Sequence, residues 1–188
     1  MRNNDDLPAN AKKAFSGELF DVWQWDQKMY DGSTKTFERI SRADAVVVIA
    51  IVNDKIMILN QEQPDYAKPY ISMPGGRVED GEDPLESAKR ELLEETGYES
   101  SDWEFLRKDQ PMHKINCQIH IFIARNCKKT GEQNLDSGEK IEVKWYDFDQ
   151  FLSLANDDDK FHYRTLVTYL FRARLDENKM KELKERLF

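Results

Sequence analysis

Apolar and polar residues follow two different periods along this chain, and the periods predict strands followed by helices. Ala45–Val52 is a continuous apolar run typical of a buried strand, and a turn at residues 53–54 leads into a second run, Ile56–Asn60. Further strands are expected at 103–106, 115–124 and 141–146. From Asp147 the apolar spacing becomes that of helices, which continue to Phe188. This order favours one α/β domain over residues 42–188, with a mixed sheet flanked by helices.

The residues before this domain have a pattern of their own. Residues 1–14 are polar and are expected to be loosely held. Residues 18–28 and 34–41 are rich in aromatic and β-favouring residues, and the turn signal at 31–33 joins them, so 15–41 is predicted to be a β-hairpin. Its residues Trp23, Trp25 and Tyr30 are either a stacking platform for a base or, as is commoner on strands, part of a core or interface.

The most clearly marked helix of the chain is expected between residues 83 and 97. Asp83 can cap the first free amide groups, Pro84 suits the first helical position, and Gly97 suits the position after the last turn. An apolar stripe at 85, 88 and 92 should face the core. Just before this segment, Pro74-Gly75-Gly76 allows the backbone to approach another group closely.

Three carboxylates, Glu91, Glu94 and Glu95, crowd a second face of this helix. Like charges at such spacing repel by about a few tenths of a kcal/mol per pair, so a bound cation would relieve them. Oxygen ligands without His or Cys suit a hard cation, and Mg²⁺ in particular binds carboxylates together with the phosphate oxygens of a substrate. The pattern thus favours a metal and phosphate site, and its alternative is a solvated acidic helix face.

The spacing of these residues resembles the signature of the Nudix hydrolases. The chain has Gly76, five residues, Glu82, seven residues, and then the run REL-x-EE-x-G over 90–97, which agrees at each fixed polar and glycine position. Tyr98 departs from the family, which usually has an aliphatic residue there. The resemblance implies the Nudix fold, an α/β/α sandwich with a mixed sheet, and a pyrophosphohydrolase activity.

The resemblance also implies roles for individual residues. Two or more Mg²⁺ ions, or Mn²⁺ in their place, would be held by Glu91, Glu94 and Glu95, with the carbonyl of Gly75 adding an oxygen. Arg90 and Glu82 would brace the helix behind them, and Arg90, Glu94 and Glu95 are expected to be needed for catalysis. Gly76 is expected to lie against the substrate.

Other segments resemble the ADP-ribose pyrophosphatases, the subgroup that cleaves nucleoside diphosphate sugars. The similar stretches, at 15–22, 37–46 and 62–64, belong to a region that spans roughly residues 15–150. In that subgroup the leading hairpin packs against, or is exchanged with, a second subunit, which implies a homodimer; a hairpin at the edge of a monomer is the alternative. Arg42 lies where the family often contacts the phosphate or sugar, although it can equally be a surface charge.

The resemblance places the general base on the loop before the strand at 141–146. Glu139 is the candidate, Glu142 and Asp136 are the runners-up, and a solvated loop acid is the alternative for Glu139. Asp65 stands where the subgroup commonly has an arginine, so the choice of substrate is the open point. The expected reaction is Mg²⁺-dependent cleavage of ADP-ribose or a related nucleotide sugar to a nucleoside monophosphate and a sugar phosphate. The alternatives are another nucleoside diphosphate derivative, such as GDP-mannose, a dinucleoside polyphosphate or a modified nucleotide, and a non-catalytic nucleotide sensor.

Composition changes this picture only in what it excludes. The 188 residues, 39% hydrophobic and 34% charged, suit one soluble globular domain. The net charge of −8 argues against nucleic acid as a partner. The longest apolar run is too short to span a bilayer, and the first residues lack the apolar core of a signal peptide, so a cytoplasmic protein without membrane contact is expected. Cys117 and Cys127 could be neighbours in a hairpin, but two free thiols are expected.

Overall fold

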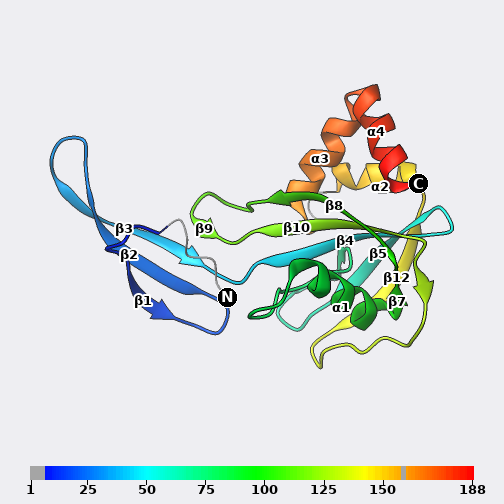
Figure 1. The fold of residues 1–188 in the computed structure, drawn as a ribbon, viewed down its shortest axis with the longest axis horizontal. Coiled ribbons are helices and arrows are strands. Elements are labelled where there is room, and N and C mark those ends of the chain that lie inside the picture. The colour runs from blue at the N-terminus through cyan, green and yellow to red at the C-terminus, as the bar shows by residue number, and fades with distance from the viewer. Residues whose placement is uncertain (1–6, 158–159) are drawn as a thin grey trace.

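The computed structural model describes residues 7–157 and 160–188, and its centre is a mixed sheet (Figure 1). Within the described residues six strands form this sheet, in the order β12-β5-β4-β10-β8 with β6 added to β5. β10 runs parallel to β4, and the other pairs are antiparallel. The strands are β4 (Ala45–Val52), β5 (Lys55–Glu62), β6 (Tyr70–Ser72), β8 (Asp102–Asp109), β10 (Ile119–Arg125) and β12 (Lys140–Tyr146).

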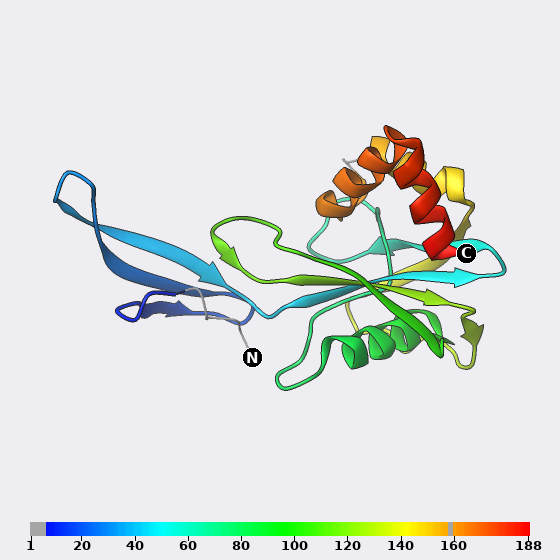
Figure 2. The ribbon, with the colours of Figure 1, turned by 45° about the horizontal axis from the view of Figure 1, so that its top comes forward.

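Helices cover both faces of the sheet, as Figures 1 and 2 show. One face carries α1 (Pro84–Thr96), and the other carries α2 (Phe148–Ser153), the short 3₁₀ turn η1 (Leu154–Asn156), α3 (Arg164–Arg174) and α4 (Glu177–Leu187). β4 is apolar on both sides for this reason: Val47, Ile49 and Ile51 pack toward α2–α4, whereas Val46, Val48 and Ala50 pack toward α1. The predicted α/β/α sandwich is confirmed. None of the helices in the described part of the chain is long and apolar enough to cross a membrane.

A second, smaller sheet projects from the sandwich as an arm (Figures 1 and 2). It contains β1 (Lys12–Ser16), β2 (Asp21–Lys28), β3 (Thr34–Ser41) and β9 (Ile115–Asn116), in that order. We call this sheet the arm throughout. The expected hairpin is therefore joined by a third strand, β1, where the sequence predicted a loosely held segment; residues 1–6 of that segment lie outside the described residues.

β1 escaped prediction because polar contacts and backbone pairing hold it, rather than an apolar face. All five of its residues are exposed. Lys13 Nζ lies 2.8 Å from the carboxylate of the buried Asp21, and Ser16 Oγ donates to the same side chain at 2.8 Å. Of the aromatic residues of the arm, Trp25 is buried and Trp23 donates its indole N–H to Ser41 Oγ. Both tryptophans are thus packed within the arm.

The single strand expected at 115–124 was wrong, because the structure has two strands there, β9 and β10, which belong to different sheets. β9 pairs with β3 of the arm, whereas β10 pairs with β4 and β8 of the sandwich. At the break, the Asp44 carboxylate accepts the Gln118 N–H at 2.8 Å, and the Cys117 thiol donates to the Ala43 carbonyl at 3.3 Å. One segment of chain therefore passes from the arm into the sandwich. Cys117 and Cys127 are free thiols and both are buried.

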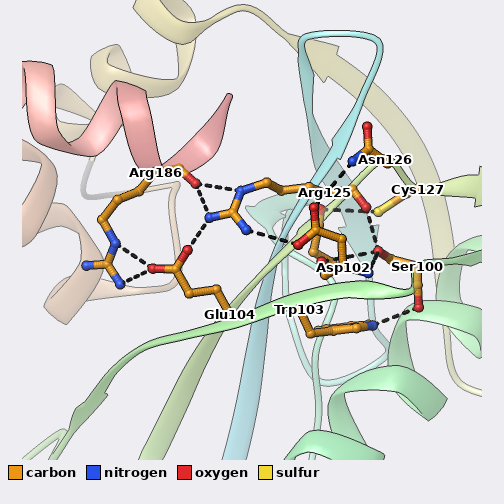
Figure 3. Close-up of polar contacts among 9 residues, drawn as sticks. Ser100, Asp102, Trp103, Glu104, Arg125, Asn126, Cys127 and Arg186 are labelled. Carbon is orange, nitrogen blue, oxygen red and sulfur yellow. Dashed lines mark hydrogen bonds and ion pairs between the residues drawn. The ribbon is translucent and has the colours of Figure 1, made fainter.

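The last helix is fastened to the sheet by an ion-pair network (Figure 3). Glu104 of β8 accepts hydrogen bonds from Arg125 of β10 and from Arg186 of α4, the latter with its Nε at 2.7 Å. Arg125 also donates to the Arg186 carbonyl, with its Nε at 2.8 Å, and to Asp102 at 3.2 Å. Burial opposes the charge of Glu104, but the two arginines outweigh it and hold its pKa below the ordinary value.

We predict that Glu104→Gln lowers the free energy of unfolding by about 1 kcal/mol at neutral pH, because it removes the charge shared by two arginines. A carboxyl whose pKa is lower in the folded state stabilises above its ordinary pKa of 4.5 and loses this effect as the pH falls. The difference between variant and parent should therefore shrink below that pH. Urea titrations at several pH values measure it. Glu185→Gln is the control, since Glu185 is exposed on α4 beside Lys181; equal losses in both variants would contradict the network's role.

Candidate active site

The ends of α1 are formed as the sequence predicts. Asp83 Oδ1 accepts the Leu85 N–H at 2.8 Å, and Pro84 is the first helical residue. Gly97 adopts a left-handed conformation, with φ 74°, and its N–H donates to the Leu93 carbonyl. A Cβ on Gly97 would lie 2.2 Å from the Gly131 carbonyl, so the loop after β11 (Lys128–Lys129) packs directly on the end of this helix.

Two glycines bring the chain before α1 close to both β4 and the acidic helix face. The Val46 N–H donates to the Gly76 carbonyl at 2.9 Å. A Cβ on Gly75 would lie 2.1 Å from the Val46 carbonyl oxygen, whereas a Cβ on Gly76 would lie 2.5 Å from the Glu91 carboxylate. Backbone atoms exclude a side chain at Gly75, whereas a side chain at Gly76 would displace the Glu91 carboxylate. The turn at 75–76 therefore packs between β4 and α1.

Glu95 is the most deeply buried of the three carboxylates, with 5% of its surface exposed. Its Oε2 accepts the Gly75 N–H at 2.7 Å, and its Oε1 accepts from Gln61 Nε2 at 3.2 Å. Burial raises its pKa well above the usual range, and the nearby Glu91 and Glu139 add to this. Gly75 thus meets the site through its N–H, and the role of its carbonyl as a metal ligand stays a prediction.

Arg90 lies among the carboxylates and joins the helix to the loop before it. Its Nε and Nη2 contact the two oxygens of Glu82 at 3.0 and 3.1 Å, while its Nη1 contacts Glu91 at 2.9 Å and Glu94 at 3.0 Å. The paired guanidinium lowers the pKa of Glu82 to about 2. Burial raises the pKa of Glu91, although Arg90 offsets part of this. The structure therefore brings together Arg90, Glu82 and the acidic face.

The donor set fits a hard divalent cation, although a cation would have to displace a contact. In the described residues no group of three or more His, Cys, Asp and Glu side chains stands ready to hold a metal ion. Instead, Arg90 Nη1 lies within hydrogen-bond distance of both Glu91 and Glu94. All the available ligands are oxygens. The pKa values of Glu91 and Glu95 are raised, and a nearby positive charge would lower them.

The loop before β12 places Glu139 at the edge of this site. Asn134 N–H donates to the Glu94 carbonyl at 2.8 Å, and Gln133 Nε2 donates to the Glu95 carbonyl at 2.7 Å, so the loop is fixed to the end of α1. Glu139 is half-buried, and burial raises its pKa, with the charges of Asp136 and Glu94 adding to the effect. Its charge in turn contributes to the raised pKa of Glu95.

Glu139 and its two runners-up do not share one environment. Asp136 and Asp65 line the same open pocket as Glu139. The pocket has a volume of about 480 Å³. Glu142 lies on β12, is mostly exposed and pairs with Lys144. Of the three acids, Glu139 is half-buried, whereas Asp136 and Glu142 are exposed.

Arg42 is not part of the acidic cluster. Its guanidinium lies over the ring of Phe20, with 5.8 Å between Cζ and the ring centroid, and its backbone N–H donates to the Asn116 carbonyl. It makes no ion pair with Glu91, Glu94 or Glu95, all of which are described. Arg42 thus stands between the arm and the start of β4, and its contact with a substrate stays a prediction.

Several residues near the site were not predicted. The expected strand ends at Asn60, but Gln61 also lies in β5 and contacts Glu95, while Tyr70 Oη donates to Gln61 Oε1 at 2.7 Å. Gln133 and the half-buried Tyr163, whose hydroxyl donates to the Met73 carbonyl at 3.3 Å, support the same region. The alternation at the end of β5 was the only local signal for Gln61.

Comparison with known proteins agrees with this geometry. The family model of the Nudix domain matches residues 41–170, so the chain belongs to the Nudix family. It is 30% identical to a methanol dehydrogenase activator of Bacillus methanolicus over 160 aligned residues, and the alignment covers 84% of this chain and 86% of that protein. It is 26% identical over 168 residues to an ADP-ribose pyrophosphatase of Bacillus subtilis strain 168, which covers 88% and 91%.

The fold has also been seen in a solved structure. A crystal structure of an ADP compounds hydrolase superposes with a TM-score of 0.73 at 22% identity, over 88% of this chain and 90% of that one. The matched family region begins at residue 41, so most of the arm precedes it. The chain is a Nudix hydrolase, and enzymes of this family act on small nucleotide substrates and generally use divalent metal ions.

The two glycines of the turn give a matched pair of variants. Gly75→Ala should lower the free energy of unfolding by about 1–3 kcal/mol, because the new Cβ meets the backbone of Val46. Gly76→Ala should leave the melting temperature nearly unchanged, because the new Cβ meets only the end of the Glu91 side chain. It should instead weaken Mn²⁺ binding by about tenfold or more, measured by titration calorimetry. An unchanged Mn²⁺ affinity in Gly76→Ala would contradict the assignment of Glu91 to a metal site.

Proposed function

We propose that the chain catalyses Mg²⁺-dependent hydrolysis of the pyrophosphate bond of ADP-ribose or a related nucleoside diphosphate sugar, giving a nucleoside monophosphate and a sugar phosphate. The observation that carries the proposal is the gathering of Glu91, Glu94 and the buried Glu95 against the turn at Gly75-Gly76. The similarity to an ADP-ribose pyrophosphatase over 88% of the chain supports this class of substrate.

The reaction needs positive charge and an aimed water. A pyrophosphate is inert in water because its anionic oxygens repel a nucleophile, so an enzyme must neutralise those oxygens and orient the attacking water. Two or more Mg²⁺ ions held by Glu91, Glu94 and Glu95 would supply that neutralising charge, and Mn²⁺ has the same preference for oxygen ligands. Gly76 has no side chain to separate Glu91 from a bound substrate.

Glu139 is proposed as the general base. Burial raises its pKa, and a carboxylate with a raised pKa is a stronger base. Its loop is fixed to α1 by hydrogen bonds from Gln133 and Asn134. The pairing of Glu142 with Lys144 makes Glu142 a weaker candidate. Asp136 lines the same pocket but is exposed.

The pocket beside Glu139 favours a second candidate within the same reaction class. Asp65 lines this pocket, where the ADP-ribose subgroup commonly has an arginine, and Asp136 and Glu139 make it more acidic still. A pocket of this charge would accept a neutral or cationic part of a substrate more easily than a phosphate. Another nucleoside diphosphate derivative is therefore the alternative substrate. A non-catalytic nucleotide sensor is disfavoured, since each carboxylate of the signature is present.

We predict that Glu94→Gln reduces turnover of ADP-ribose by about a hundredfold or more, because it removes one of the charges that would hold the cation while keeping the side chain's size. Glu139→Gln should also reduce kcat with little change in KM. Release of AMP and ribose 5-phosphate, followed by chromatography, measures both. Glu86→Gln is the control, since Glu86 lies exposed on the same helix and pairs with Lys89.

Each outcome bears on a different part of the proposal. Near-normal turnover in Glu94→Gln would contradict the metal site. An unaltered rate in Glu139→Gln would transfer the role of base to Glu142 or Asp136. A parent enzyme that leaves ADP-ribose intact but cleaves other members of a panel of nucleotide sugars, dinucleotides and triphosphates would replace the substrate and keep the reaction class.

We also propose that the enzyme is a homodimer formed through the arm, without nucleic-acid or membrane partners, in the cytoplasm. The arm exposes several large apolar side chains that its own strands do not cover: Phe15, Leu19, Phe20 and Ile40. A second subunit would bury them. The net charge of −8 disfavours nucleic acid, and two free, buried thiols suit a reducing compartment.

The apolar surface of the arm makes the dimer testable. Leu19→Lys should shift the sedimentation coefficient from that of a dimer to that of a monomer, because it places a charge where a partner would bury an apolar side chain. Leu175→Lys is the control, as Leu175 is exposed on the helical layer far along the chain from the arm. A parent protein that sediments as a monomer at micromolar concentration would refute the proposal.

A further inference from the structure

A chain of two hydrogen bonds leads from Tyr70 through Gln61 to Glu95. Gln61 of β5 and Tyr70 of β6 are direct cross-strand neighbours, so their side chains lie on the same face of the sheet. Tyr70 Oη donates to Gln61 Oε1 at 2.7 Å, and Gln61 Nε2 donates to Glu95 Oε1 at 3.2 Å. Both Gln61 and Tyr70 are buried, at 5% and 8% exposure.

The direction of these bonds is fixed by the chemistry of their two ends. In the ionised form that binds a cation, the Glu95 carboxylate can only accept, so the amide of Gln61 turns its NH₂ toward Glu95 and its oxygen toward Tyr70. Tyr70 must then donate. Burial raises the pKa of Tyr70 to about 12, and the neighbouring acids act in the same direction, so its hydroxyl keeps the proton that it donates at neutral pH.

The ring of Tyr70 is itself held from the far end of the chain. It stacks on His162, with ring centroids 3.9 Å apart and planes 9° apart, and it contacts Tyr66 at 4.9 Å. The backbone of His162 is fixed in turn, because its main-chain N–H donates to the carbonyl of Ile71, next to Tyr70 on β6, at 3.1 Å. The segment before α3 thus fixes Tyr70, and Tyr70 fixes Gln61.

We propose that Gln61 and Tyr70 are positioning residues that hold the Glu95 carboxylate in the orientation needed to bind a divalent cation. Glu95 has its other oxygen bonded to the Gly75 N–H, so the two contacts together fix the plane of the carboxylate. Without the Tyr70 hydroxyl, the amide oxygen of Gln61 loses its donor, so the Gln61 side chain is no longer held against Glu95. The inference rests on the metal site of the proposed function, and it adds residues outside the Nudix signature to that site.

The test uses Mn²⁺ alone, titrated into the full-length protein by calorimetry without nucleotide. Tyr70→Phe keeps the ring on His162 and removes only the hydroxyl, and it should weaken Mn²⁺ binding by about tenfold. Gln61→Leu should weaken it at least as much. If Tyr70 acts through Gln61, the double variant should bind Mn²⁺ no more weakly than Gln61→Leu. Tyr66→Phe is the control, because it removes a hydroxyl from the same aromatic group that takes no part in the two bonds.

Turnover separates positioning from general loss of structure. At low Mn²⁺ the kcat of Tyr70→Phe should fall, and saturating Mn²⁺ should restore it, with the KM of the nucleotide unchanged. Equal Mn²⁺ affinity in the parent and in a folded Tyr70→Phe would overturn the inference, as would a loss in the double variant equal to the sum of the two single losses. A parent that binds Mn²⁺ but does not cleave ADP-ribose would overturn only the substrate. A parent that does not bind Mn²⁺ would overturn both this inference and the metal site.

Discussion

The burial of Glu95 is the constraint on which the site depends. A carboxylate removed from water is stable in its charged form only when hydrogen bonds or a cation compensate for the lost hydration. Here the compensation comes from the Gly75 N–H on one side and the Gln61 amide on the other. The remaining imbalance appears as a raised pKa. The protein therefore folds with a group that is prepared for positive charge.

Glu91 and Glu94 lie on the same helix as Glu95, but a positive charge, that of Arg90, compensates them. Arg90 contacts both Glu91 and Glu94, while it binds Glu82 with two hydrogen bonds. A guanidinium in this position lowers the repulsion between acids that would otherwise destabilise α1. The arrangement makes the acidic face compatible with a stable fold before any cation arrives.

How much of this structure could be predicted depended on the distance along the chain between the interacting residues. The caps at Asp83 and Gly97, the doubly buried β4 and the grouping of the three carboxylates are encoded within a few residues, and the structure has the elements as expected. The strand β1, the break at 117–118 and the contact from Gln61 to Glu95 arise from pairing between remote segments. No local period records such pairing. The hydrogen bond from the Gly75 N–H to Glu95 also joins residues twenty positions apart, and the expected role of the Gly75 carbonyl as a metal ligand stays a prediction.

The passage of residues 115–125 from the arm into the sandwich has a mechanical consequence. β9 is bonded to β3 of the arm, and after two intervening residues the same segment begins β10, which lies beside β4 for six residue pairs. The arm cannot tilt by bending a single hinge near Arg42, since a second connection crosses the same boundary. Any tilt must either break the β3–β9 ladder or pull on β10, so a load applied to the arm is transmitted to β10 and to its neighbour β4. The start of β4 is hydrogen-bonded to the turn at Gly75-Gly76, through the Val46 N–H and the Gly76 carbonyl.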